Sequence, residues 1–355
     1  MIKLAIVGTG GIAHWHAKSF QNIEDVKIVG ACDIDKERVN TFAQEYNIEK
    51  TYNSFDHLLE DCEFDAISNA TPDPFHKEIA LKAIKKNKHV FSEKPLAENY
   101  PDAKEMYEAI KDTNLINMVN FSYRNSSGYQ ELAKVVQSGK IGKVRHVDAS
   151  YYQSWLTCKY WGDWKTQDQW LWRLSTAHGS MGTLGDIGVH IFDFASFPVG
   201  QIKSINSRLK TFKDKGEKIG QYVLDANDTF ISMIEFDNGA LGTVSATRFA
   251  TGFKNRLDLK IFGELGAVKI SFEDPIQEGN QYQITNDTER VLKEKSDKLK
   301  WNTIITKPTP NNFERFIESI KRQTNDQPNF QRGAEIQKIL DACSESSQKN
   351  IWIDL

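Results

Sequence analysis

Residues 3–13 read KLAIVGTGGIA, a short apolar run that leads into a cluster of glycines. The cluster fits the spacing GxGxxA, in which the first glycine allows a tight turn and the second lets a phosphate approach the backbone. The small third residue lets the following helix pack closely on the strand, and the helix N-terminus favours an anionic ligand. The segment therefore predicts a strand, a dinucleotide-binding turn and a helix. The predicted cofactor contacts here are Gly8, Thr9, Gly10, Gly11 and Ile12.

A second apolar run, VKIVGACDID at 26–35, carries an acidic residue at the distance this type of site requires. Asp33 lies about 20 residues beyond the glycines, where a carboxylate accepts hydrogen bonds from the adenosine ribose and repels a 2′-phosphate. Lys36 and Arg38 follow closely, and we interpret them as the solvated face of the next helix. The cofactor predicted from these residues is NAD rather than NADP.

The first third of the chain alternates short β-rich runs with amphipathic helical stretches. Strand, helix and strand in this rhythm indicate a parallel sheet with crossover helices, so residues 1–121 are expected to form a dinucleotide-binding Rossmann domain of the α/β class. The expected strands are 3–8, 26–32, 64–70, 89–92 and 115–120. The expected helices between them include 34–46, 75–86 and 101–112.

The pattern changes after residue 121, and strands then follow one another with few helices between them. This indicates an α+β domain over 122–310 with a large, mostly antiparallel sheet. Its expected helices are 127–138 and 182–197, and its expected strands are 144–153, 202–212, 229–236, 240–248, 257–262 and 267–272. Residues 311–355 are expected to form C-terminal helices, over 311–322 and 332–347. Thr309 and Pro310 are expected to form the N-cap and first turn of the helix over 311–322.

Composition sets the broad class of the protein. The 355 residues are 39% hydrophobic and 26% charged, which is ordinary for a globular protein of two domains. A net charge of −3 gives no reason to expect nucleic acid as a partner. The four cysteines form no CxxC pair and have no zinc spacing, so we expect free thiols, no metal and a reducing compartment. No apolar run is long enough to span a membrane, and the expected location is the cytoplasm.

Three residues are candidates for chemistry on their position alone. Lys94 follows the strand at 89–92, and the carboxyl ends of parallel strands form the ligand crevice of such folds. Asp186 and His190 share one face of the helix expected at 182–197. A histidine near neutral pKa suits removal of a hydroxyl proton, and a carboxylate one turn away can orient it or hold a substrate. A buried structural histidine is the competing interpretation.

Five motifs in this order resemble the glucose–fructose oxidoreductase / inositol dehydrogenase (Gfo/Idh/MocA) family over essentially the whole chain. They are GTGGIA at 8–13, CDID at 32–35, ATPDPFH at 70–76, EKP at 93–95 and GTLGDIGVHIFD at 182–193. The resemblance implies Lys94, Asp186 and His190 as the catalytic set, and a final helix that packs back on the first domain. It also implies Asp33 as the ribose ligand. Further cofactor contacts are expected from Thr71, Pro72, His76, Glu93, Lys94, Trp172 and Arg173.

A narrower resemblance is to levoglucosan dehydrogenase-like sugar dehydrogenases of this family. It rests on residues 106–124, YYQSW at 151–155, WLWR at 170–173 and residues 232–248. It implies a sugar pocket that includes Asp186 and His190 and is lined by Tyr123, Arg124, Gln153 and Trp155. Residues 156–169 match no part of that pattern, although five tryptophans lie between 155 and 172. Their rings either bind sugar faces or simply pack this stretch on the sheet.

These features favour an NAD-dependent dehydrogenase that acts on a sugar, anhydrosugar or cyclic polyol. The alternatives are an NAD-using glycosidase of the same fold and a nucleotide-binding regulator without turnover. We also expect a homodimer or homotetramer, because a large antiparallel sheet leaves one face uncovered and such faces pair through two-fold contacts. The strand at 256–262 alternates, with Leu257, Leu259 and Ile261 on one side.

Overall fold

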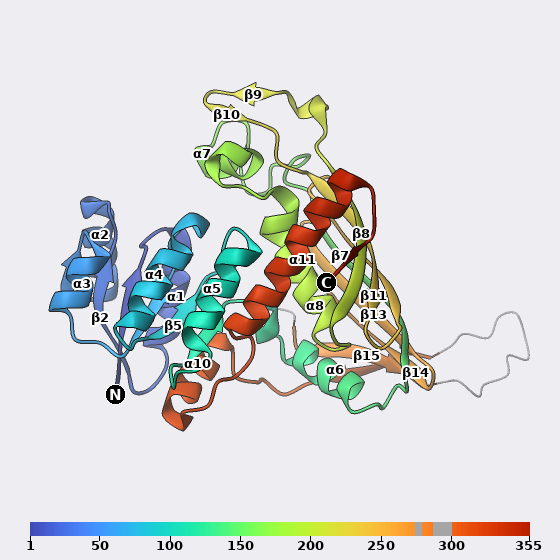
Figure 1. Cartoon of the computed structure of the whole chain (residues 1–355), viewed down its shortest axis with the longest axis horizontal. Helices are drawn as coiled ribbons and strands as arrows, with labels where there is room; N and C mark the ends of the chain where they lie inside the picture. Colours follow the sequence, from blue (N-terminus) through green and yellow to red (C-terminus); the bar gives the residue numbers. More distant parts are fainter. Residues whose placement is uncertain (274–278, 287–299) are drawn as a thin grey trace, which may run out of the picture. The chain divides into compact units, whose positions relative to one another are not determined.

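The structure is a computed structural model that describes residues 1–273, 279–286 and 300–355 (Figure 1). The chain forms two compact units. The N-terminal unit contains Met1–Phe121 and Pro310–Gln337, and the second unit contains Ser122–Thr309 and Lys338–Leu355. Within the described ranges, none of the helices is both long and apolar enough to cross a membrane.

The N-terminal unit is built on a six-stranded parallel sheet of order β3-β2-β1-β4-β5-β6. The strands are β1 (Ile2–Val7), β2 (Val26–Cys32), β3 (Lys50–Tyr52), β4 (Ala66–Asn69), β5 (His89–Ser92) and β6 (Asn117–Val119). The helices are α1 (Gly11–Gln21), α2 (Lys36–Tyr46), α3 (Phe55–Asp61), α4 (His76–Lys85), α5 (Tyr100–Ile110) and α10 (Asn312–Arg322). The expected Rossmann-type sheet is confirmed. The strand β3 and the helix α3 were not predicted, because elements of three and seven residues are too short to show a period.

The core of this unit contains a residue group from the distant end of the chain. Phe313 of α10 packs edge-on against Phe20 of α1, with ring centroids 5.0 Å apart, and tilts over Phe91 of β5 at 4.9 Å. All three rings are buried. The helix α10 therefore contributes to the hydrophobic core of the N-terminal unit.

The second unit is built on a nine-stranded sheet of order β16-β15-β14-β13-β7-β12-β11-β8-β17. The strands are β7 (Val144–Gln153), β8 (Ile202–Lys210), β11 (Thr229–Phe236), β12 (Leu241–Thr247), β13 (Asn255–Gly263), β14 (Gly266–Phe272), β15 (Gln281–Thr285), β16 (Asn302–Ile305) and β17 (Ile353–Asp354). A separate hairpin joins β9 (Lys218–Ile219) and β10 (Tyr222–Val223). The helices are α6 (Ser127–Gln137), α7 (Asp168–Leu171), α8 (Val189–Ser196) and α11 (Phe330–Lys349), whose residues after Gln337 belong to this unit. All pairs are antiparallel except β7 with β12, so the expected mostly antiparallel sheet is confirmed.

One face of the nine-stranded sheet is buried and the other is open. Leu257, Leu259 and Ile261 have no exposed surface, and α8 packs against their strand. The open face instead carries Ile231 and Met233, which are 58% and 49% exposed. The three aliphatic residues singled out from the sequence thus lie in the core, because alternation marks the two faces without saying which of them helices cover.

Two expected helices differ in detail from the structure. The helix expected over 182–197 starts at Gly182 as expected, but it contains a π-helix over Leu184–Gly188 before it continues as α8. The start of α10 is capped by Asn311, whose side chain accepts from the Glu314 N–H while the Glu314 carboxylate accepts from the Asn311 N–H. The expected cap at Thr309 was wrong. Glu314 lies three residues after Asn311 and completes the reciprocal pair, whereas the residue three positions after Thr309 is Asn312.

Candidate functional site

The glycine turn after β1 has the shape that a pyrophosphate requires. Gly8 has φ +84°, and a Cβ there would lie 2.7 Å from the backbone of Ala70 and Thr71. A Cβ on Gly10 or Gly11 would meet no protein atom within 4 Å, so the space beside them is open. Gly10 caps α1 without a side-chain hydrogen bond, which leaves the helix N-terminus available for an anion. The residues present therefore fit a dinucleotide, and Ile12 in the first turn is 42% exposed.

The carboxylate of Asp33 stands at the end of β2 and is tightly held. Its Oδ2 accepts from the Thr9 N–H at 2.8 Å and the Thr9 hydroxyl at 2.9 Å. Arg38 donates from Nε to Oδ2 at 3.1 Å and from Nη2 to Oδ1 at 2.6 Å. Burial alone would raise the pKa of Asp33, but hydrogen bonds from Arg38, the Asp35 N–H and Thr9 lower it to about 2. Arg38 is thus an ion-pair partner of Asp33, although the sequence analysis assigned it to the solvated helix face.

The loop after β4 is fastened to the turn after β5 by a buried histidine. His76 has no exposed surface, and its Nδ1 lies 2.7 Å from the Pro95 carbonyl oxygen while its Nε2 lies 2.8 Å from the Thr71 carbonyl oxygen. The Thr71 hydroxyl donates to Asn69 Oδ1 at 2.7 Å. Both ring nitrogens of His76 are engaged by backbone, so this residue shapes the Thr71–Pro72 loop.

Glu93 is buried behind Lys94 in a polar network. Its Oε1 lies 2.8 Å from His16 Nε2 and accepts from Asn120 Nδ2 at 2.6 Å. The other His16 nitrogen meets the Ser68 hydroxyl at 2.8 Å. Burial opposes ionisation, yet His16, Lys94 and Asn120 outweigh it and lower the pKa of Glu93 to about 2. The Glu93 carboxylate is therefore bound to buried protein groups, while Lys94 is partly exposed at the carboxyl end of β5.

In the second unit, several expected substrate residues form one connected row. The Tyr123 and Tyr151 hydroxyls hydrogen-bond each other, and Tyr151 donates to Asn255 Oδ1 at 2.8 Å. Gln153 Nε2 donates to the same oxygen at 2.9 Å. The His190 ring packs edge-on against Tyr123 with centroids 4.7 Å apart. Two aromatic rings, two amides and an imidazole are thereby gathered around the ends of β7 and β13.

Trp155 lies behind this row. Its ring is 3% exposed, and its Nε1 donates to Gln153 Oε1 at 3.2 Å. Trp170 packs against it with centroids 5.6 Å apart, and the Arg248 guanidinium lies 4.8 Å from its centroid. Trp155 therefore holds the Gln153 amide in place by a hydrogen bond, and its ring is too buried to present an open face on which a ligand could stack.

Asp186 is held by an arginine that the sequence analysis did not single out. Arg248 Nη2 donates to Asp186 Oδ2 at 2.9 Å, and Arg173 Nε lies 3.9 Å from the same oxygen. The Arg173 side chain is 30% exposed and stacks over Trp172 at 4.5 Å. Arg173 thus contacts both Asp186, through its guanidinium, and Trp172, through the ring face.

Arg124 lies apart from these groups in the interior. It is 1% exposed, and its Nε and Nη2 donate to the two oxygens of Asp193 at 2.7 and 2.6 Å. Its guanidinium also covers the Phe197 ring at 3.5 Å. These bonds anchor Arg124 to Asp193 of α8, while its Nη1 has no hydrogen-bond partner among the described residues. The substrate contact that the resemblance implies for Arg124 stays a prediction.

Tyr151, Asn255 and Arg248 were not predicted from the sequence, although the structure brings them to the candidate site. Tyr151 and Arg248 lie inside segments quoted for the resemblance, but no spacing rule distinguishes them from structural neighbours. Asn255 opens a strand and carried no signal. Within the described part of the chain, no group of three or more His, Cys, Asp or Glu side chains is arranged to hold a metal ion.

Comparison with known proteins supports both units. Residues 2–121 match the family model described as "Oxidoreductase family, NAD-binding Rossmann fold", and residues 129–269 match the "GFO/IDH/MocA C-terminal domain". Levoglucosan dehydrogenase of Pseudarthrobacter phenanthrenivorans is 26% identical over 88% of this chain and 85% of its own. Myo-inositol 2-dehydrogenase of Thermotoga maritima is 26% identical over 78% of this chain and 76% of its own.

Solved structures agree with these matches. Levoglucosan dehydrogenase in complex with NADH and levoglucosan superimposes with a TM-score of 0.87 at 25% identity, covering 100% of this chain and 99% of that one. An oxidoreductase domain protein from Kribbella flavida superimposes with a TM-score of 0.86 at 28% identity, covering 99% and 98%. The chain belongs to the Gfo/Idh/MocA family of oxidoreductases, and its N-terminal unit is the NAD-binding Rossmann domain of that family.

Proposed function

We propose that this protein is an NAD-dependent dehydrogenase that oxidises a hydroxyl-bearing carbon of a sugar, anhydrosugar or cyclic polyol. The observation that carries the proposal is the row Tyr123–Tyr151–Asn255–Gln153 beside His190. Phenol, amide and imidazole groups in close array suit a ligand rich in hydroxyls. The family membership supplies the redox cofactor, and two of the similar proteins are named for compounds of this class, levoglucosan dehydrogenase and myo-inositol 2-dehydrogenase.

Each candidate catalytic residue has a distinct role in this proposal. NAD, when bound, accepts the hydride that leaves the substrate carbon. His190 takes the proton of the reacting hydroxyl as a general base. Lys94 donates a hydrogen bond to the same oxygen and favours the developing alkoxide. Asp186 fixes either the substrate or the imidazole.

The remaining expected contacts fall into two groups. We retain Tyr123, Arg124 and Gln153 as substrate contacts, and Trp172 and Arg173 on the cofactor side. Trp155 acts through another residue, because it supports the Gln153 amide.

The direct test is a panel of sugars, anhydrosugars and inositols with NAD and NADP, followed by absorbance of the reduced nicotinamide. General-base assistance contributes about 10²–10⁴-fold, so His190→Ala and Lys94→Ala should each lower kcat at least about a hundredfold. NAD binding should change little. The two losses should not add, since both groups act on one oxygen.

His57→Ala is the matched control, because His57 is exposed on α3, and it should keep full activity. A His190→Ala variant that keeps its activity but loses thermal stability would show that His190 is only a core residue. An NAD-using glycosidase would instead release the leaving group of an aryl glycoside without net NADH. A regulator would do neither.

The proposal includes assembly and location. The open sheet face with Ile231 and Met233 suits a homodimer or homotetramer. The cysteines are unpaired, and three of the four are buried, which fits a reducing compartment such as the cytoplasm.

A further inference from the structure

Arg248 is one of the largest side chains in the protein without exposed surface. It directly follows β12, and its backbone N–H donates to the Asp228 carbonyl at 3.1 Å. Burying a guanidinium is costly unless its charge and its donors find partners, so a buried arginine needs a structural explanation. Its contacts supply one.

The donors of Arg248 join segments that are far apart in the sequence. Nη1 donates to the Arg173 carbonyl at 3.1 Å, and Nη2 donates to the Gly182 carbonyl at 3.3 Å and to Asp186 Oδ2 at 2.9 Å. The flat guanidinium also lies 4.8 Å from the Trp155 ring centroid. One side chain therefore fixes the start of the π-helix segment, the carboxylate on it, and the tryptophan that orients Gln153.

The charge around Asp186 comes from several elements. Arg248 approaches from the end of β12, and Arg173 approaches from the 172–174 turn. Tyr151 of β7 faces Asp186, and burial together with Tyr123 and Asp186 raises its pKa well above the ordinary value. His190 follows four residues later on the same helical segment. Arg248 is the buried cation of this group, with a side chain 0% exposed against 30% for Arg173.

We propose that Arg248 is a positioning residue for the reaction, which holds Asp186 ionised and in one orientation and couples it to the Trp155–Gln153 pair. Arginine suits this task because its planar fork donates in several fixed directions, which a lysine ammonium cannot reproduce. The kinetic part of this inference rests on the proposed dehydrogenase function. The electrostatic part does not.

The first experiment measures Asp186 directly. Protein labelled with ¹³C at the aspartate carboxyl carbons is titrated by NMR, and the Asp186 signal is assigned from its loss in Asp186→Asn. An adjacent cation lowers a carboxyl pKa by about 1–3 units, so Arg248→Met should move the Asp186 midpoint upward by about one unit or more. Arg256→Met is the control, since Arg256 of β13 pairs with Asp258 and with Glu273, which follows β14, and its loss should leave this midpoint unchanged. An unmoved midpoint in Arg248→Met would overturn the proposal.

The second experiment is kinetic. In Arg248→Met, kcat should fall by about a hundredfold while NAD affinity stays the same, and the acid limb of the kcat/KM profile should move to higher pH. The double variant Asp186→Asn/Arg248→Met should be no slower than Asp186→Asn alone, because Arg248 acts through Asp186. A loss of the same factor at every pH that multiplies with Asp186→Asn would indicate a merely structural role.

Two further outcomes are distinguishable. If Arg248→Met does not fold, Arg248→Lys decides, since it keeps the charge but not the fork. A kcat loss of at least about tenfold with unchanged NAD affinity supports the proposal, and wild-type kcat overturns it. If the wild-type protein oxidises no sugar or polyol, the proposed function fails, while the NMR midpoint still tests the role of Arg248.

Discussion

Single carboxylates in the N-terminal unit show how one residue can serve both the fold and the cofactor. Asp33 and Glu93 are both nearly inaccessible, and both stay ionised because several donors converge on each of them. Asp33 also holds Thr9 of the glycine turn in place, and Glu93 links α1 to the strand end that carries Lys94. Changes at these residues therefore have separable consequences for cofactor choice and for stability.

The choice between NAD and NADP should follow from Asp33. A carboxylate that remains ionised at neutral pH repels a 2′-phosphate, so kcat/KM should favour NAD by at least about tenfold, or 1.4 kcal/mol. In Asp33→Ser this preference should shrink, because Arg38 loses its shortest carboxylate contact and can meet a phosphate. Glu49→Gln is the control, since Glu49 is a surface carboxylate that pairs with Lys27. Equal kcat/KM values for the two cofactors in the wild type would contradict this role of Asp33.

Acid stability should depend on Glu93. Its pKa falls from an ordinary 4.5 to about 2 in the folded protein, so its stabilisation is complete above pH 4.5 and disappears as the pH falls toward 2. Across this window the wild type should lose a few kcal/mol, about 1.4 kcal/mol for each pKa unit, from the free energy of unfolding. Glu93→Gln should lack this part of the pH dependence.

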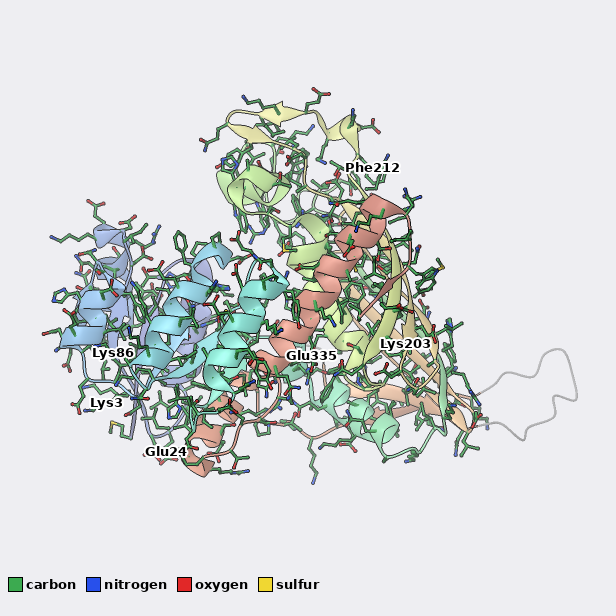
Figure 2. All side chains as sticks on the ribbon, viewed as in Figure 1. Lys3, Glu24, Lys86, Lys203, Phe212 and Glu335 are labelled. Atoms are coloured by element: carbon green, nitrogen blue, oxygen red, sulfur yellow. The ribbon has the colours of Figure 1, made fainter. Side chains whose placement is uncertain are left out.

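Urea titrations between pH 2.5 and 5 measure the difference. The matched control is Glu24→Gln, because Glu24 lies on the surface of the N-terminal unit (Figure 2). Parallel pH curves for the wild type and Glu93→Gln would show that the Glu93 carboxylate is not preferentially ionised in the fold.

At the scale of elements, the irregular turns are the informative ones. The π-helix over Leu184–Gly188 carries Asp186, and it is rich in glycine because a larger residue would not fit. A Cβ on Gly185 would lie 2.3 Å from the Met181 Cβ. Single-turn π-bulges inside helices are frequent at functional sites, and here the bulge places a carboxylate against Arg248. The periodicity of a regular helix predicts neither feature.

The capping box of α10 should contribute measurably to stability. Asn311→Ala removes the acceptor for the Glu314 N–H, and loss of such a cap costs about 1 kcal/mol of the free energy of unfolding. Thr309→Ala should cost less, because the Thr309 hydroxyl has no hydrogen-bond partner among the residues that the structure describes. Chemical denaturation of the two variants measures this order, and the reverse order would rule out Asn311 as the cap.

At the scale of the whole molecule, the open sheet face governs assembly. Ile231, Met233 and Leu241 are each about half exposed on neighbouring strands, which is unusual for apolar side chains unless another surface covers them. We expect a dimer or tetramer at micromolar concentration by light scattering. Ile231→Lys/Met233→Lys should dissociate it, whereas Val223→Lys on the separate β9–β10 hairpin should not. A wild-type protein with the mass of a monomer would disprove the expected assembly.

Local features of the sequence were sufficient for five of the six strands of the N-terminal sheet and for the candidate residues at its strand ends. The glycine spacing, the distance to Asp33 and the strand end before Lys94 are short-range patterns, and backbone geometry requires them wherever the chain runs next. The sequence likewise indicated six strands of the second sheet but not the short strands β15, β16 and β17. These predictions survive because a tight turn or a buried strand restricts the residues that form it.

The contacts of the second unit required the folded chain. Arg248 and Asp186 are 62 residues apart, and Tyr151 meets Asn255 because β7 pairs with β13 in one register. A shift of one residue in that register would turn each side chain to the opposite face of the sheet. The pairing depends on packing of the whole unit, so no local pattern could name Arg248, Tyr151 or Asn255, or show that Arg124 is buried against Asp193.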